Sequence, residues 1–244
     1  MKKLGIGAFM WMFTILPIFS TEPSAYVLCY HTFLGKPSIE TDFSSKEFQS
    51  HIQILQSHGI RFVTFEDILC HRIRGKKNVL LVIDDGNIST KKVYETILKP
   101  AKIYPMLAIY PGIIDSRKFA LKWNDLISMQ EDGCTIASHG YFHQYLTTTY
   151  AHYHPKEFED EFFKSKQLLE RHLRHVVPYF VYPFGITSNI AIQRIKKSGY
   201  RYAFTIKPTP ISLSTLTKSP LLLPRFMVTR RNYQHILTRI TKDS

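Results

Sequence analysis

The sequence is poor in several features, and each absence narrows what the protein can be. It has three cysteines, Cys29, Cys70 and Cys134, and no C-x-x-C pair, so neither a disulfide-stapled fold nor a cysteine zinc site is indicated. We expect buried, unpaired thiols, with one disulfide as the alternative. The 11 glycines and 13 prolines form no repeat, which excludes collagen-like and low-complexity chains. The longest apolar run, residues 4–19, is shorter than the roughly 20 residues that span a bilayer.

Acidic residues are also scarce. There are 19 Asp and Glu against 32 Lys and Arg, which gives a formal net charge of +13 at pH 7. This charge suits nucleic acid, an anionic membrane or an acidic cell wall and does not choose among them. The basic residues occur as scattered doublets without an aromatic-interleaved motif, so nucleic acid is not the expected partner. Because 44% of the residues are hydrophobic, the chain can build a sizeable core.

Residues 1–24 have the pattern of a secretory signal. Lys2 and Lys3 precede the apolar run, and a polar stretch follows it. We therefore predict export to the periplasm, the cell envelope or the medium, with an uncleaved N-terminal anchor as the alternative. The mature chain, from about residue 25, is still strongly basic.

From residue 25 onward, short apolar runs alternate with amphipathic stretches, which is typical of βα units around a parallel sheet. The predicted strands are 26–30, 61–64, 79–83, 105–109, 135–138, 179–182, 202–206 and 221–226. The predicted helices are 45–58, 65–73, 89–98, 123–131, 157–175, 189–198 and 233–241. Proline and hydroxyl residues predict an exposed loop over 207–220. No linker divides the chain, so one barrel-like α/β domain over residues 25–244 is the simplest account.

The predicted strand 79–83 is followed by two adjacent carboxylates, Asp84 and Asp85, and then by Gly86. Neighbouring side chains of a strand point to opposite faces, so both acids can reach one site only if the chain turns, which Gly86 permits. Two carboxylates so close raise each other's pKa unless a cation separates their roles. The alternative is a strand end followed by a helix-capping Asp.

His139 and His143 directly follow the predicted strand 135–138. If the chain is helical or tightly turned there, the i, i+4 spacing puts both imidazoles on one face. Two His and one carboxylate form the ligand set of catalytic zinc and non-haem iron sites, with positions left open for water and substrate. The chain has 11 His, so an isolated pair is weak evidence, and we interpret other pairs, such as His51 and His58, as surface residues.

Polar or turn features follow five predicted strands at their C-terminal ends. Besides the acids and the imidazoles, these are His31, the Tyr182-Pro183-Phe184-Gly185 turn and Arg225. In parallel barrels the active site is built at this rim, by loops from several strands. We therefore predict that the five features meet at one site.

The chain resembles the polysaccharide deacetylase family with its NodB homology domain (carbohydrate esterase family 4). The resemblance rests on motifs that occur in the family's order: Asp84-Asp85-Gly86, Ser138-His139-x-x-x-His143, Tyr182-Pro183-Phe184-Gly185 and Leu223-Pro224-Arg225. Tyr30-His31 and the segments 43–59 and 123–133 are most similar to the branch that deacetylates poly-N-acetylglucosamine.

The resemblance implies a distorted (β/α) barrel of about seven strands in a single domain. It implies that N-acetyl groups are hydrolysed from an N-acetylhexosamine glycan of the cell wall or of an extracellular polysaccharide. It also implies one divalent metal ion, with Asp85, His139 and His143 as its ligands. Zinc is the first candidate for this ion, and iron, cobalt and nickel are alternatives.

The resemblance also implies the other catalytic roles. Asp84 would be the general base, Arg225 would pair with it, and His31 would be the general acid. The turn that contains Tyr182, Phe184 and Gly185 would contact the substrate, with the Phe184 N–H directed at the oxyanion.

The sequence departs from the family pattern at Ile83 and Asn87, beside the acid pair, and at two further places. Gly140 stands where a hydroxyl residue often follows the first His, so one hydrogen bond beside the metal is missing or comes from water. The Tyr-Pro motif lacks the preceding Arg of the wider family, and Arg225 is the candidate substitute. The alternative function is a catalytically silent glycan-binding or envelope-assembly protein on the same scaffold.

Overall fold

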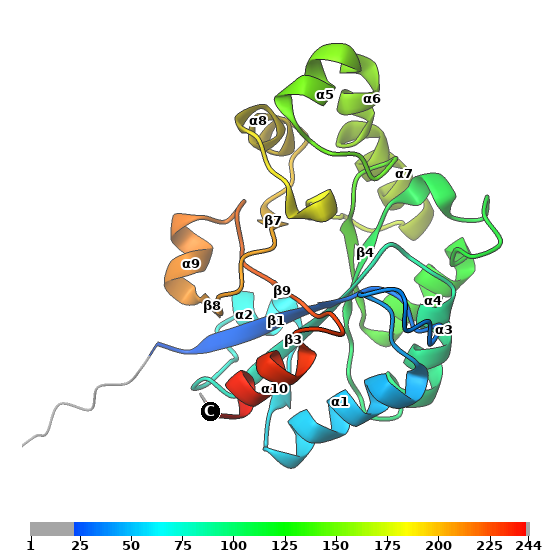
Figure 1. The fold of residues 1–244 in the computed structure, drawn as a ribbon. Helices are drawn as coiled ribbons and strands as arrows, with labels where there is room; N and C mark the ends of the chain where they lie inside the picture. Colours follow the sequence, from blue (N-terminus) through cyan, green and yellow to red (C-terminus); the bar gives the residue numbers. More distant parts are fainter. Residues whose placement is uncertain (1–21, 243–244) are drawn as a thin grey trace, which may run out of the picture.

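One sheet organises the part of the chain that the structure describes, residues 22–242 of a computed structural model (Figure 1). Its strands are β1 (Ser24–Tyr30), β2 (Arg61–Phe62), β3 (Asn78–Asp84), β4 (Met106–Ile109), β5 (Thr135–Ser138), β6 (Tyr179–Val181), β7 (Tyr202–Phe204), β8 (Ile211–Ser212) and β9 (Phe226–Met227).

The strands follow the order β7-β6-β5-β4-β3-β1-β8, with β2 paired to β3 and β9 paired to β1. The pairings are parallel except for β1 with β8. The segment that ends in β9 spans the remaining gap, because Leu223 bridges to Phe204 of β7 and Phe226 pairs with Leu28 of β1. The sheet therefore curls on itself, and the predicted distorted (β/α) barrel of about seven strands in one domain is confirmed.

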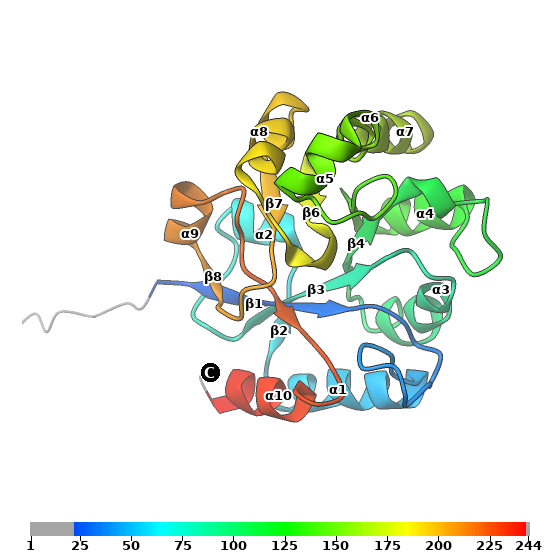
Figure 2. The same cartoon turned by 45° about the horizontal axis from the view of Figure 1, so that its top comes forward.

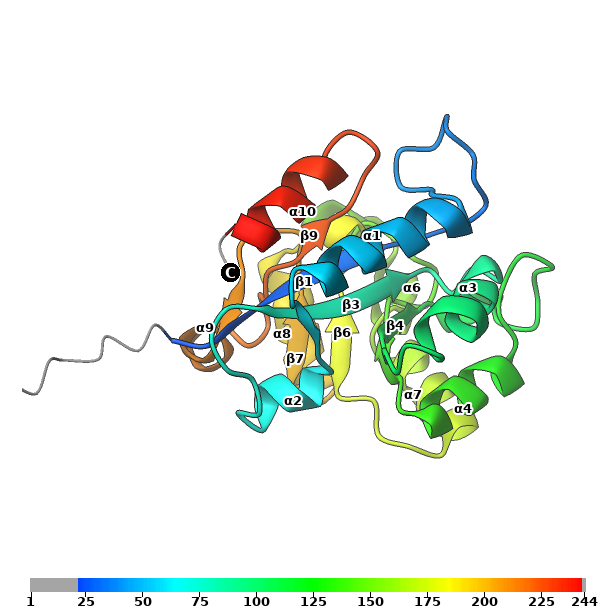
Figure 3. The same ribbon diagram turned by 90° about the horizontal axis from the view of Figure 1, so that it is seen from below.

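Helices surround this sheet (Figure 2). They are α1 (Ser45–Ser57), α2 (Phe65–Leu69), α3 (Ser89–Val93), α4 (Trp123–Asp132), α5 (Thr148–Tyr153), α6 (Pro155–Asp160), α7 (Phe163–Leu173), α8 (Asn189–Lys197), α9 (Leu213–Lys218) and α10 (Tyr233–Lys242). The first and last helices, α1 and α10, lie side by side on one flank, and α4 and α7 lie together on another (Figure 3).

The strands are buried on both faces, which is why they are nearly continuous apolar runs. Along β1, Val27 packs with Leu80 and Val82 in one buried cluster, whereas Tyr26 and Leu28 belong to a second cluster that the helices share. Alternation of side chains along the strand produces this division.

Several local predictions were wrong. The single predicted helix 157–175 is two helices, α6 and α7, separated at Glu161 and Phe162, and α5 precedes them. Pro155 favours a new helix start because its fixed φ suits the first turn. The predicted loop 207–220 contains β8 and α9, whose first turn is capped by the Ser212 hydroxyl. Finally, His51 is buried, not at the surface.

All three cysteines are free thiols, and Cys70 is exposed, contrary to the expectation that each would be buried. Residues 1–21 of the predicted signal segment lie outside the described part of the chain. Among the described residues, no helix combines the length and apolar character needed to cross a membrane.

Candidate active site

The chain turns sharply directly after β3. Asp85 has a φ of +75° and Gly86 a φ of +72°, so two successive residues adopt the left-handed conformation. A Cβ at Gly86 would lie 3.1 Å from Ile109 Cδ1, which favours glycine there. Because of this turn, both neighbouring carboxylates approach the same ring nitrogen. His139 Nε2 lies 3.7 Å from Asp84 Oδ2 and 3.6 Å from Asp85 Oδ1.

Asp84 forms a buried ion pair with Arg225. The guanidinium Nη1 lies 2.8 Å and 3.0 Å from the two carboxylate oxygens, and both side chains are almost completely buried. Burial alone would raise the pKa of Asp84, but the charges of Arg225, His139 and His31 hold it well below its usual range. Arg225 Nε also donates to the Thr205 carbonyl, 3.1 Å away. Asp84 is therefore ionised and held in one orientation.

Three possible metal-ligating atoms converge beside this pair. His143 Nε2 lies 3.4 Å from Asp85 Oδ1 and 3.2 Å from His139 Nε2. Asp85 Oδ1 is buried and has no hydrogen-bond partner among the described residues. The Val181 carbonyl lies 2.7 Å from His139 Nδ1, which fixes that nitrogen as the donor and leaves Nε2 free to bind a metal. One carboxylate and two imidazoles with these orientations fit a divalent metal ion.

Electrostatics favour the ligand form of both rings. Burial lowers the pKa of His139 to about 3 and also lowers that of His143. Burial raises the pKa of Asp85 to about 6, and the charge of Asp84 acts in the same direction while His31 opposes it. Neutral imidazoles with exposed lone pairs are the form that binds a metal.

Aromatic rings flank His143 on the open side of the site. The ring centroids of Phe184 and Tyr110 lie 4.5 Å and 5.2 Å from that of His143. Phe184 is also stacked on Tyr145, with centroids 4.0 Å apart, and both rings are about half exposed. His143 and Phe184 have φ values of +60° and +57°, so strained backbone gathers at this site.

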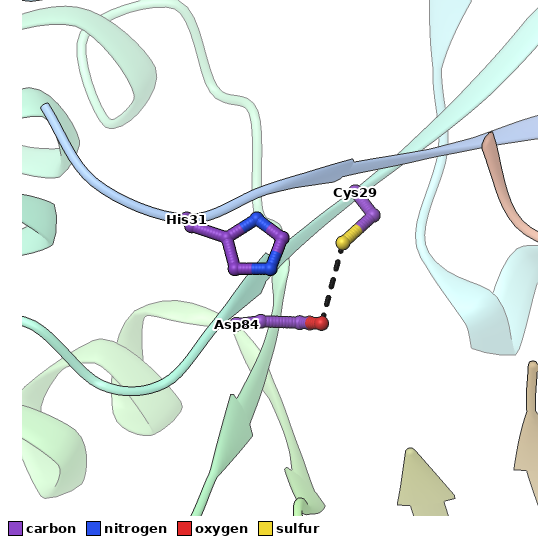
Figure 4. Close-up of side chains that lie close together, drawn as sticks. All are labelled: Cys29, His31 and Asp84. Atoms are coloured by element: carbon purple, nitrogen blue, oxygen red, sulfur yellow. Dashed lines mark hydrogen bonds between the residues drawn. The ribbon is translucent and has the colours of Figure 1, made fainter. Parts of the chain in front are cut away.

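His31 and Cys29 approach Asp84 from β1 (Figure 4). Cys29 Sγ donates to Asp84 Oδ2 at 3.2 Å, and one ligand-type atom from each of the three side chains lies within 4.8 Å of the others. Burial raises the pKa of the Cys29 thiol well above its usual value. His31 Nδ1 is buried and has no hydrogen-bond partner among the described residues.

The residues of the Tyr182–Gly185 turn have different surroundings, some within the core and some at the candidate site. Tyr182 is fully buried, and its hydroxyl donates to the Leu221 carbonyl at 3.2 Å, so its side chain does not face the site. The Gly185 N–H donates to the Tyr182 carbonyl at 2.9 Å. Of the three residues predicted for the oxyanion turn, Phe184 is the one whose ring lies against that of His143.

Sequence reasoning did not identify Glu161, Ser165, Cys29 or the exposed ring of Tyr145. Glu161 accepts hydrogen bonds from the backbone N–H groups of Tyr141 and Phe142, which lie between the two histidines in the sequence. The available signal was its place on the apolar stripe of the predicted helix 157–175. An acid on such a stripe is informative because it must be buried with partners.

The comparisons with known proteins agree with this arrangement. The family model for polysaccharide deacetylase matches residues 71–203, which is more than half of the chain. The chain belongs to the polysaccharide deacetylase family. The resemblance expected from the motifs is thereby confirmed, and this polysaccharide deacetylase is a hydrolase.

Two relatives share a name, poly-beta-1,6-N-acetyl-D-glucosamine N-deacetylase. The one from Staphylococcus aureus (strain MRSA252) is 23% identical over 208 residues, which cover 80% of this chain and 71% of the relative. The one from Staphylococcus epidermidis is 24% identical over 217 residues, with coverage of 80% and 70%.

Two solved structures have the same fold. IcaB from Ammonifex degensii has a TM-score of 0.76 and 26% identity, and the match covers 90% of this chain and 97% of IcaB. The Streptococcus pyogenes deacetylase PplD, in complex with acetate, also has a TM-score of 0.76, with 19% identity and coverage of 91% and 99%. At that identity the second match describes the fold alone.

Proposed function

We propose that this polysaccharide deacetylase is an exported, metal-dependent enzyme that hydrolyses the N-acetyl groups of poly-N-acetylglucosamine. The observation that carries the proposal is the buried Asp84–Arg225 pair, which lies directly beside the three converging atoms of Asp85, His139 and His143. The relatives named for this activity, and IcaB among the solved structures, support the choice of polymer.

Asp85, His139 and His143 would hold the metal ion. A divalent ion at these ligands supplies Lewis-acid polarisation of the acetyl carbonyl and makes water more acidic. Zinc is the first candidate, and iron, cobalt or nickel also suit two imidazoles and a carboxylate.

Asp84 would take a proton from the attacking water. A general base must be ionised and correctly oriented. Arg225 would keep Asp84 in this state through its contacts of 2.8 Å and 3.0 Å with the carboxylate oxygens. His31, which lies close to Asp84, would give a proton to the departing nitrogen. The amide C–N bond breaks, the water oxygen leaves in acetate, and the sugar keeps a free amine.

The Phe184 N–H would stabilise the oxyanion, since the ring of Phe184 lies against that of His143. The stacked rings of Phe184 and Tyr145 would also contact the sugar next to the one that reacts. Exposed apolar rings beside a polar site are typical of ligand-binding surfaces. Their position at the edge of the site supports a polymeric substrate over a free monosaccharide.

The excess of basic residues would hold the exported enzyme near an anionic membrane or cell-wall surface. The net charge of +13 includes the N-terminal segment, and most of it remains on the mature chain.

The test is acetate release from defined glycans by the purified full chain. β-1,6-linked and β-1,4-linked N-acetylglucosamine oligomers and peptidoglycan fragments would be compared after chelation and after reloading with zinc, cobalt, nickel or iron. We expect metal-dependent release that is fastest with the β-1,6-linked oligomers. Release that survives complete chelation would contradict the metal role, and preference for another polymer would contradict the substrate. Binding without any release would favour the silent glycan-binding alternative.

A further inference from the structure

Glu161 is a buried acid that the catalytic roles above leave unused. It lies between α6 and α7, its exposed fraction is 0%, and it forms no ion pair within the described part of the chain. Its Oε2 accepts the Tyr141 N–H at 2.8 Å and its Oε1 accepts the Phe142 N–H at 3.0 Å. Burying a carboxylate without a cation is costly, and backbone N–H groups of the turn compensate it, those of His143 and Gln144 as well as those of Tyr141 and Phe142.

Gly140 makes room for this carboxylate. A Cβ at position 140 would lie 2.2 Å from Glu161 Oε2, a distance at which the acid must move. Gly140 also has a φ of +78°, which disfavours other residues there. The glycine that departs from the family motif and the buried acid are therefore matched, because the acid occupies the space that a hydroxyl side chain would need.

Ser165, one helical turn beyond Glu161, holds the same turn from its other side. Its hydroxyl donates to the Gly140 carbonyl at 2.8 Å and lies 2.7 Å from the Ser138 hydroxyl. Glu161, just before α7, and Ser165, within α7, thus bind two N–H groups and a carbonyl of one short turn. That turn connects His139 to His143, and His143 has a strained φ of +60°. Surrounding contacts must hold such a conformation in place.

We propose that Glu161 is a positioning residue for the metal site, whose carboxylate fixes the 139–143 turn so that His139 Nε2 and His143 Nε2 face one ion. It acts through the backbone and does not touch the ion. The inference rests on the proposed function only in taking the two imidazoles as metal ligands.

Metal affinity of the full chain tests this role. Calorimetric titration of the metal-free protein with Zn²⁺ and Co²⁺ would be combined with the visible spectrum of the cobalt form and with thermal unfolding. We expect Glu161→Gln and Glu161→Ala to weaken binding by about 10–100-fold, the usual range for residues that orient metal ligands. Glutamine keeps one acceptor oxygen, so its loss should be the smaller. The cobalt spectrum should change in both variants.

Glu170→Gln is the matched control. Glu170 lies on α7 and, like Glu161, accepts a backbone N–H, that of Val177 at 2.9 Å, but it has no hydrogen bond to the 139–143 turn. This variant should lower the melting temperature and leave the metal affinity and the cobalt spectrum unchanged. A merely structural Glu161 would behave in the same way. Wild-type affinity and spectrum in folded Glu161→Ala would overturn the proposal.

If Glu161→Ala does not fold, a double-mutant cycle of Gly140→Ala with Glu161→Gln tests the proposal instead. Gly140→Ala should weaken metal binding strongly in the wild type and less in a Glu161→Gln background, where the uncharged group can move away more easily. Equal losses in both backgrounds would show that the glycine and the acid are not matched. Because these readouts are metal affinities, a chain that binds zinc normally but releases no acetate would refute the proposed function alone.

Discussion

Strand β3 begins at Asn78 and ends at Asp84, and both side chains are almost fully buried. Asn78 uses its amide to donate to three backbone carbonyls, those of Ser24, Arg74 and Gly75, and its oxygen accepts from Arg61. Every polar atom of the side chain has a partner, and all of the partners belong to the fold.

At the other end of the strand the polar groups are charged and incompletely paired. Asp84 is compensated by Arg225, yet Arg225 Nη2 and Asp85 Oδ1 are buried and have no partner among the described residues. Unsatisfied buried atoms cost stability unless a ligand or an ion satisfies them. The comparison separates polar groups that are fully paired within the fold from polar groups that are left unpaired at the candidate site.

The largest expected effect is that of Asp84→Asn on turnover. The amide keeps the shape of the side chain but cannot accept the proton of water, so kcat should fall by about 10²–10⁴-fold. Acetate release per folded molecule, with folding checked by circular dichroism, measures this. Turnover within tenfold of the wild type would mean that this end of β3 is not the catalytic one.

Arg225→Met should have the largest effect on stability, a loss of about 3–5 kcal/mol, because it leaves the Asp84 charge buried without its partner. The sign of the pH dependence is diagnostic. In the wild type the depressed pKa of Asp84 contributes stability above its ordinary pKa of 3.8, and that contribution is lost as the pH falls further. In the variant, burial raises this pKa, so acidification toward pH 4 should stabilise the protein. Urea unfolding at several pH values measures both, and an unchanged pH dependence would contradict the role of the pair.

Asn78→Ala should cost about 1–3 kcal/mol in the free energy of unfolding, because carbonyls at the start of β3 lose their donors. The turnover of the folded variant should equal that of the wild type. Urea unfolding and acetate release at 25 °C test the two statements separately. A fall in kcat without a fall in stability would contradict the assignment of Asn78 to the fold and not to the site.

The smallest expected effect is that of Tyr145→Ala. Removing the stacked, half-exposed ring should raise KM for a hexameric substrate by about 5–10-fold, equivalent to roughly 1 kcal/mol of contact with the sugar. The stability and the kcat should change little. Comparing oligomers of different length locates the lost contact, and an equal rise in KM for the shortest and longest oligomers would place Tyr145 outside the polymer-binding surface.

Sequence reasoning predicted the barrel well because its strands are buried on both faces and therefore stand out as apolar runs. It also predicted that the acids, the imidazoles and Arg225 share one rim, since the carboxyl ends of parallel strands lie at one edge. Asp84 and Arg225 are 141 positions apart, and only the sheet topology brings them together.

What the sequence could not provide depends on short elements and local breaks. The predicted strand 221–226 is reduced to β9, which covers only Phe226–Met227. Pro224 has no N–H that could extend the strand pairing toward residue 221. The position of Glu161 relative to the apolar stripe indicates burial, but the break between α6 and α7 that brings it to the 139–143 turn has no clear signal in the sequence. The contact of Cys29 with Asp84 has no local signal, because the two residues lie on neighbouring strands.

The segment that closes the barrel also delivers Arg225, and this links activity to the completeness of the chain. Until the residues that follow β7 dock between β7 and β1, the Asp84 carboxylate has no guanidinium beside it. A chain that lacked this segment would carry both acids and both imidazoles and would still lack the charge partner of Asp84. The segment that completes the curled sheet is therefore also the one that supplies the buried cation beside Asp84.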